Sequence, residues 1–99
     1  MKPLNIEPGR VVLSKAGRDK GKFFIVLNVL EDGRYAEIAD GDLRKITKTK
    51  KKKVIHIHAK PDLALDIKIK LQNKSVILDS EIRKYLVKWQ KGKKEDQLV

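Results

Sequence analysis

The 99-residue sequence contains no cysteine, which excludes disulfide bonds, thiol catalysis and thiolate metal ligands. It has no apolar run of about eighteen residues, so we expect no membrane span. Its longest apolar stretch, residues 23–30, is interrupted by Asn28 and lies too far along the chain for a secretory signal. No serine stands in a Gly-x-Ser-x-Gly context, and the carboxylate pairs Glu31/Asp32 and Asp40/Asp42 lie at predicted turns, where turn formation explains them. Nothing in the sequence supports an enzyme.

Positive charge is what the sequence has in excess. Twenty-four Lys and Arg stand against 13 Asp and Glu, which gives a net charge of +11. The length fits one domain of roughly 100–150 residues, and an apolar fraction of 40% is enough for a small core. A charge excess of this size indicates a polyanionic partner, although charge alone does not separate RNA from DNA.

The basic residues form two segments separated by an acidic one. Residues 10–22 carry a net charge of +4, residues 23–42 a net charge of −4, and residues 43–60 a net charge of +8 with no acid. If the basic segments meet in space, they form one positive face that would attract a phosphate backbone. The alternative is a solvated lysine-rich surface, but eight bases without one acid exceed what solubility requires.

The first sixty residues have the pattern of a small β-domain. Short apolar runs predict five strands at residues 11–14, 23–30, 35–39, 43–46 and 54–58, with a lysine-rich loop at residues 48–53. Turns are predicted at residues 31–34, where Gly33 can take a positive φ, and at Asp40-Gly41, which suits a type I′ turn. Residues 23–30 are apolar on both faces, so we expect this strand to be covered on both sides in a small antiparallel barrel.

The pattern changes after Pro61, which is expected to close the barrel. We predict a barrel at residues 1–60, a helical extension at 61–92 and a frayed tail at 93–99. In residues 63–71 alternating apolar side chains favour a strand, although one helical face is also apolar.

A C-terminal helix is the firmest expectation. Asp79 is a good N-cap and Gly92 a natural residue for the C-terminal end. The helix carries an apolar stripe of Ile82, Tyr85, Leu86 and Trp89. We expect Trp89 to pack on the barrel; stacking of Tyr85 and Trp89 on nucleic-acid bases is the less favoured alternative.

Residues 14–22 form a charged loop between two predicted strands. Gly17 and Gly21 let the backbone turn sharply and allow close approach of another backbone. Arg18 and Lys20 would then point outward, and Asp19 would accept backbone N–H groups as a turn-maker. The spacing is not that of a nucleotide phosphate loop.

Two histidines flank Ile57 and would lie on the same side of a strand at residues 54–58. Ile55 and Ile57 would then face the core, and His56 and His58 would face outward. A metal site needs further ligands, and a lysine-rich surround repels cations, so we predict no metal site and no cofactor. RNA contact or plain surface explains the histidines better.

The loop and its flanking strands resemble a KOW motif. Residues 9–22 (GRVVLSKAGRDKGK), followed by Phe23, Phe24, Ile25 and Val26, match its pattern of strand, Gly-(Lys/Arg)-(Asp/Glu)-Lys-Gly-(Lys/Arg) and second strand. Residues 40–46 (DGDLRKI), the Lys50 to Lys53 run and residues 80–86 (SEIRKYL) are similar to short bacterial KOW proteins related to the archaeal and eukaryotic large-subunit ribosomal protein numbered fourteen. The resemblance covers roughly residues 8–92.

This resemblance implies a Src-homology-3-like barrel with one or two C-terminal helices, and it favours a helix at residues 63–71. It also implies a non-catalytic, cytoplasmic protein, monomeric when free, that binds structured ribosomal RNA and possibly ribosomal proteins. The residues expected to contact RNA are Lys15, Gly17, Arg18, Lys20, Gly21, Lys22, Arg44, Lys45, Lys48, Lys50, Lys51, Lys52, Lys53 and His56. Arg18 and Arg44 are expected to make bidentate contacts. The competing interpretations are a protein-interaction module, as in elongation factors similar to NusG, and DNA binding.

Overall fold

The computed structural model describes the backbone of residues 4–98 and the side chains of residues 4–90. This part of the chain contains five strands: β1 (Arg10–Ser14), β2 (Phe23–Leu30), β3 (Tyr35–Ala39), β4 (Lys50–Lys53) and β5 (Ile57–Leu63). Two helices follow, α1 (Leu65–Gln72) and α2 (Asp79–Leu98). Short 3-10 turns lie at η1 (Glu31–Gly33), η2 (Ile46–Lys48) and η3 (Val54–His56).

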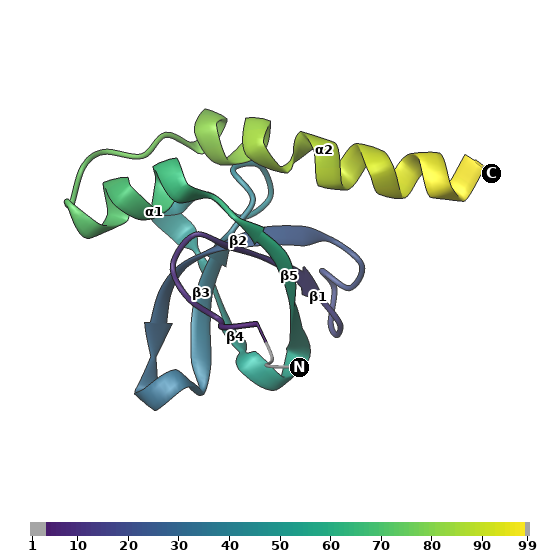
Figure 1. Ribbon diagram of the computed structural model, residues 1–99. Coiled ribbons are helices and arrows are strands. Elements are labelled where there is room, and N and C mark those ends of the chain that lie inside the picture. Colours follow the sequence, from purple (N-terminus) through teal and green to yellow (C-terminus); the bar gives the residue numbers. More distant parts are fainter. Residues whose placement is uncertain (1–3, 99) are drawn as a thin grey trace.

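The strands form one antiparallel sheet in the order β4-β3-β2-β1-β5. The central strand β2 pairs with β1 through Val12 and Phe24, and with β3 through Val26 and Ile38. Both helices lie on the same side of the sheet (Figure 1). The prediction of a small, mainly β domain with five antiparallel strands and C-terminal helices is therefore confirmed.

Apolar side chains pack on both faces of this sheet. The cluster between the sheet and the helices contains the buried residues Val11, Phe23, Ile25, Ala39, Ala64, Ile67, Ile82 and Leu86. The cluster on the opposite face contains the buried residues Val12, Phe24, Val26, Ala36, Ile38 and Ile57. Neighbours along β2 alternate between the two clusters, so this strand is covered on both sides, as its sequence predicts.

The strand predicted at residues 43–46 is wrong, because a side-chain-stabilised turn occupies this segment. Asp40 Oδ1 accepts hydrogen bonds from the backbone N–H groups of Asp42 (2.9 Å) and Arg44 (2.8 Å). Only Gly41 takes a positive φ here (+78°), so the turn is not type I′, which needs two such residues. The fourth strand is instead β4, in the lysine run predicted as a loop.

The fifth strand is also displaced from its predicted position. Residues 54–56 form η3, and β5 begins at Ile57 and continues through Pro61 to Leu63. Pro61 therefore does not end the strand. It is tolerated because β5 is an edge strand, where the missing N–H group leaves no ladder bond broken. The boundary predicted at residue 60 falls inside β5.

The two helices decide between a helix and a strand at residues 63–71, and they correct two predictions about the C-terminal end of the chain. Residues 65–72 form α1, so the alternation at residues 63–71 does not mark a strand over its whole length. Its apolar side chains divide instead between Ile67, which is buried, and Leu65 and Ile69, which are more than half exposed. The helix end predicted at Gly92 is wrong, since α2 continues to Leu98. The frayed tail expected at residues 93–99 is thus helical through residue 98, and residue 99 lies outside the described part.

Asp79 begins α2, but its side chain does not cap that helix. Its Oδ1 accepts a hydrogen bond from the backbone N–H of Ile46 at 2.8 Å, which ties η2 to the helix. The cap comes from Glu81, whose Oε2 accepts from the backbone N–H of Leu78 at 3.2 Å. Gly41 fits closely here, because a Cβ at this position would lie 2.2 Å from the Asp79 carbonyl oxygen.

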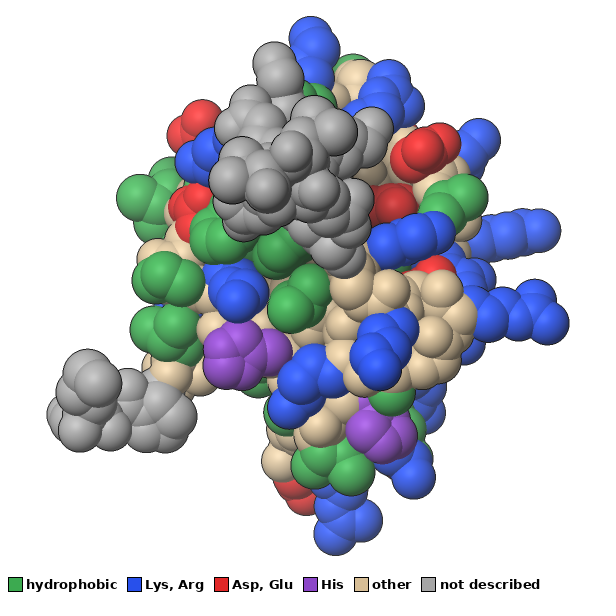
Figure 2. All heavy atoms as spheres, turned by 90° about the vertical axis from the view of Figure 1, so that its right-hand side faces the viewer, with side chains coloured by type: hydrophobic (Ala, Val, Ile, Leu, Met, Phe, Trp, Pro, Cys, Tyr) green, Lys and Arg blue, Asp and Glu red, His purple; other side chains and the backbone are tan. Residues whose placement is uncertain are grey.

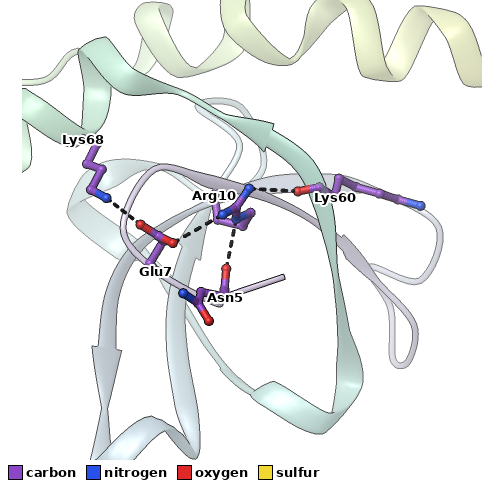
Figure 3. A network of polar contacts seen from close by, with 5 residues as sticks. All are labelled: Asn5, Glu7, Arg10, Lys60 and Lys68. Carbon is purple, nitrogen blue, oxygen red and sulfur yellow. Dashed lines mark hydrogen bonds and ion pairs between the residues drawn. The ribbon is translucent and has the colours of Figure 1, made fainter. Parts of the chain in front are cut away.

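Glu7 joins the N-terminal segment to β1 and α1 (Figure 3). Its carboxylate forms ion pairs with Arg10 and Lys68. Arg10 also donates hydrogen bonds to the carbonyl oxygens of Asn5 (2.9 Å) and Lys60 (3.4 Å). Arg10 is therefore a buried structural cation, although it belongs to a basic segment of the sequence.

Candidate nucleic-acid interface

The loop between β1 and β2 is closed by its own backbone. Ser14 N donates to Lys22 O (3.0 Å), and Gly21 N donates to Ser14 O (2.8 Å). Gly17 and Gly21 have φ values of +79° and +86°, which residues with a Cβ rarely adopt. The glycines therefore shape the loop as the sequence predicts. Arg18 and Lys20 are exposed between them.

Lys52 holds this loop from the neighbouring strand β4. Its side chain is only 8% exposed, and its Nζ donates a hydrogen bond to the Ala16 carbonyl oxygen at 2.6 Å. Lys52 lies directly opposite the buried Ala36 in the sheet, so it points to the same inner face. The structure thus gives this lysine an internal partner, and its charge fixes the loop instead of facing solvent.

Arg44 and Asp19 make a second connection to the loop. The guanidinium donates to Asp19 Oδ2 from Nε at 3.3 Å and from Nη2 at 3.2 Å. The Asp19 side chain is 7% exposed and that of Arg44 is 32% exposed. Asp19 therefore binds an arginine side chain rather than the backbone N–H groups we expected. Arg44 is engaged within the protein, which leaves less of its guanidinium for a bidentate contact with RNA.

A third connection comes from the backbone, because Lys15 N donates to His56 O at 2.8 Å. The three contacts bring residues 15–22 against Arg44, Lys52 and η3. The two basic segments of the sequence therefore meet in space, which was the condition for a single positive face.

The four lysines of β4 are divided between the two faces of the strand. Lys50 and Lys52 lie opposite the buried Ile38 and Ala36, whereas Lys51 and Lys53 lie opposite Glu37 and Tyr35. A lysine run in a strand thus presents only every second side chain to one surface.

Lys51 is partnered on the outer face of β4. Its Nζ lies 2.9 Å from Glu31 Oε2 and 4.5 Å from the centre of the Tyr35 ring. The hydrogen bond to Glu31 raises the pKa of Lys51 above its ordinary value. Lys51 therefore has an acidic partner, which distinguishes it from its neighbour Lys53.

The other basic side chains predicted to contact RNA form no ion pair with any described residue. We call them the basic patch: Lys15, Arg18, Lys20, Lys22, Lys45, Lys48, Lys50 and Lys53. Figure 2 shows Lys and Arg side chains projecting along one side of the face it presents, with some Asp or Glu side chains among them. Lys50 and Lys53 leave β4 on opposite faces, so the basic patch extends around this edge strand, and none of its cations forms an ion pair with a described acid.

The predicted arrangement of the histidines is wrong in part. His56 belongs to η3 and His58 to β5, so the two do not alternate along one strand. Ile57 is buried as expected, but Ile55 is 73% exposed because the 3-10 turn directs it outward. Within residues 4–90, no group of three or more potential metal-ligating side chains lies together.

Asp62 is a polar centre that the sequence analysis did not identify. Its carboxylate accepts hydrogen bonds from Tyr85 Oη and from Trp89 Nε1 (2.9 Å), and it pairs with Lys88 Nζ (3.0 Å). Burial alone would raise the pKa of Asp62, but these three hydrogen bonds outweigh it and hold the pKa below its ordinary value. Burial, with the bond to Asp62, raises the pKa of Tyr85 to about 12.

The same contacts decide the role of Trp89. Its ring lies 5.2 Å from that of Phe23, centre to centre, and packs against the buried cluster on the helical side of the sheet. The prediction that Trp89 packs on the sheet is confirmed. With its Nε1 also bonded to Asp62, Trp89 is not a free platform for stacking bases.

Comparison with models of known protein families finds no match, and comparison with curated protein sequences finds none either. No helix within residues 4–98 is both long enough and apolar enough to cross a membrane.

Proposed function

We propose that this protein binds structured RNA without catalysing a reaction, and that its target is ribosomal RNA of the large subunit. The finer fold belongs to the same proposal: the sheet closes as a Src-homology-3-like barrel of the KOW type. The resemblance of residues 9–22 to a KOW motif supports both the barrel and the choice of ribosomal RNA.

One observation carries the proposal. Internal contacts of Lys52 and Arg44 hold the loop of residues 15–22, and the basic patch around it has no acidic partner among the described residues. A surface that only served solubility would mix both signs of charge. Unpaired cations on a fixed framework suit a phosphate backbone, because binding releases counterions and little ordering of the protein is needed.

The first test is the salt dependence of binding to a labelled fragment of large-subunit ribosomal RNA. If about five phosphates are neutralised, log K falls with log salt at a slope of about −3.5 to −4.5. A slope near zero would contradict electrostatic binding.

Two double variants that remove equal charge test which surface of the protein binds RNA. Arg18→Gln with Lys20→Gln removes two cations of the patch, whereas Lys74→Gln with Lys84→Gln removes two exposed lysines beside the helices. We expect the first pair to make the slope shallower by up to about 2 and the second to leave it unchanged. Equal effects of the two pairs would mean that net charge alone drives binding.

Sedimentation of cell lysate on a density gradient tests the ribosomal target. Migration with large subunits that survives high salt would support a specific ribosomal site. Release at moderate salt would indicate a loosely bound accessory factor, and absence from ribosomes at low salt would exclude this target.

A further inference from the structure

An open groove lies beside the basic patch, where the turn between β2 and β3 meets η3. It has a volume of about 460 Å³ and is lined by Gly33, Arg34, Tyr35, Lys53, Val54 and Ile55. A backbone hydrogen bond from Val54 N to Arg34 O (2.9 Å) holds its two sides together. The volume falls in the range of about 300–1,000 Å³ that is typical of small-molecule pockets.

The lining combines positive charge with exposed apolar surface. Its charged groups are Arg34 and Lys53, both exposed and without an ion pair to any described residue. Ile55 is 73% exposed and adds apolar surface to the groove. Tyr35 adds a half-buried aromatic ring. The nearby acids Glu31 and Asp32 are not among the lining residues, and Glu31 is paired with Lys51.

The groove is continuous with the basic patch. Lys53 belongs to both, and η3 places Ile55 in the groove next to His56, whose carbonyl oxygen binds Lys15 N. The backbone of Lys15 is therefore bonded to a residue that follows the groove-lining Ile55 directly in the chain.

We infer that this groove receives one unpaired nucleotide of the RNA, with its base against Tyr35 and Ile55 and its phosphate at Arg34 and Lys53. The inference rests on the proposed RNA-binding function. A base needs aromatic or apolar surface for its faces, and its phosphate needs a cation, and the groove supplies both. Paired bases of an RNA duplex are not accessible in this way, so the nucleotide must be extruded from a bulge or loop.

The test compares two RNA hairpins that differ by a single unpaired nucleotide in the stem. Wild-type protein is expected to bind the bulged hairpin about fivefold or more tightly than the perfect one, which is the low end of what stacking of one base contributes. With 2-aminopurine as the unpaired base, its fluorescence should change on binding because the base leaves solvent for the groove.

Ile55→Ser should abolish the preference for the bulged hairpin and leave affinity for the perfect hairpin unchanged. Val76→Ser is the matched control, since Val76 is 79% exposed on the connection between the helices and should keep the preference. Arg34→Gln should weaken binding of the bulged hairpin more than that of the perfect one.

The outcomes separate this inference from the function on which it rests. Equal affinity of the wild type for the two hairpins would overturn the nucleotide site and leave RNA binding intact. A preference that persists in both Ile55→Ser and Arg34→Gln would place the base elsewhere and overturn the groove as its site. Failure to bind either hairpin at low salt would overturn the proposed function together with the inference.

Discussion

The helical side of the molecule and the basic patch use their charged residues in opposite ways. On the helical side, three lysines are paired with carboxylates, Lys68 with Glu7, Lys70 with Glu81 and Lys88 with Asp62, whereas the exposed Lys74 and Lys84 form no ion pair with a described residue. Around the patch, the buried Asp19 binds Arg44 and so fixes the loop, while the patch cations form no ion pair with a described residue. Both regions are lysine-rich, so it is the placement of the acids that distinguishes a structural surface from one suited to phosphate.

The largest expected effect tests whether apolar packing dominates the helical side. Leu86 is 1% exposed on the packed face of α2, so Leu86→Ala should lower the free energy of unfolding by about 2–5 kcal/mol. Val87→Ala is the control, because Val87 is 49% exposed on the same helix and should change stability by less than about 0.5 kcal/mol. Urea unfolding followed by the fluorescence of Trp89 measures both. Similar losses in the two variants would contradict this account of the helix interface.

Lys52→Met tests whether the patch depends on a fixed loop. Loss of the hydrogen bond to Ala16 should lower the free energy of unfolding by about 1–3 kcal/mol and weaken RNA binding. The slope of log K against log salt should stay the same, because Lys52 contacts no phosphate. Lys53→Met, at the exposed neighbour, should leave stability unchanged and make that slope shallower by about 0.9. If Lys52→Met also flattened the slope, Lys52 would be a direct contact.

The dependence of stability on pH should come from the helical side. Hydrogen bonds from Lys68 and Lys70 lower the pKa values of Glu7 and Glu81, and the pKa of Asp62 is also lowered. A carboxyl whose pKa is lower in the folded state stabilises the fold above its ordinary pKa and loses this contribution as the pH falls through the lowered value. The free energy of unfolding should therefore decrease below about pH 4.5.

At alkaline pH the free energy of unfolding should change with pH in the opposite direction, because of Tyr85. Its pKa is raised from 10.0 to about 12, so the fold should lose stability as the pH rises from 10 to 12. Unfolding measured across the pH range should show a flatter acid limb in Asp62→Asn and a flatter alkaline limb in Tyr85→Phe. An unchanged profile in Asp62→Asn would remove Asp62 from this explanation.

The smallest expected effect comes from removing the acidic partner of Lys51, which leaves this lysine unpaired like the cations of the basic patch. Glu31→Gln frees Lys51 and removes one negative charge near the RNA, so RNA affinity at low salt should rise by about twofold. Asp32→Asn removes the same charge without freeing a lysine and should give a smaller gain. Equal gains in both variants would mean that the pairing of Lys51 has no influence on binding.

Much of the fold could be predicted from local patterns. The apolar run at residues 23–30, broken only by Asn28, marked the doubly covered strand, and the stripe through Ile82, Leu86 and Trp89 marked the packed face of α2. The errors arose where side chains act over long distances. Asp79 resembles a helix cap but binds Ile46, and Asp40 closes a turn where a strand was predicted.

The candidate site was predictable in composition but not in detail. The sequence indicated which segments are basic, and the spacing of Gly17 and Gly21 indicated the loop. It did not show that Lys52 is internal, because a strand of four lysines contains no apolar alternation from which to assign faces. Arg34 was overlooked because it lies in the acidic segment, and only the structure brings it beside Lys53.

The lysine run in β4 has a consequence for how copies of the chain meet one another. β4 is an edge strand, and such strands present unpaired backbone groups on which a second sheet can add. Two copies pairing through this edge would place lysines opposite lysines, and like charges directly opposite destabilise a strand pair. The lysine run therefore disfavours self-association of the chain through this edge strand. Polyanions that neutralise it would remove that protection, so samples with substoichiometric RNA should aggregate more readily than the protein alone.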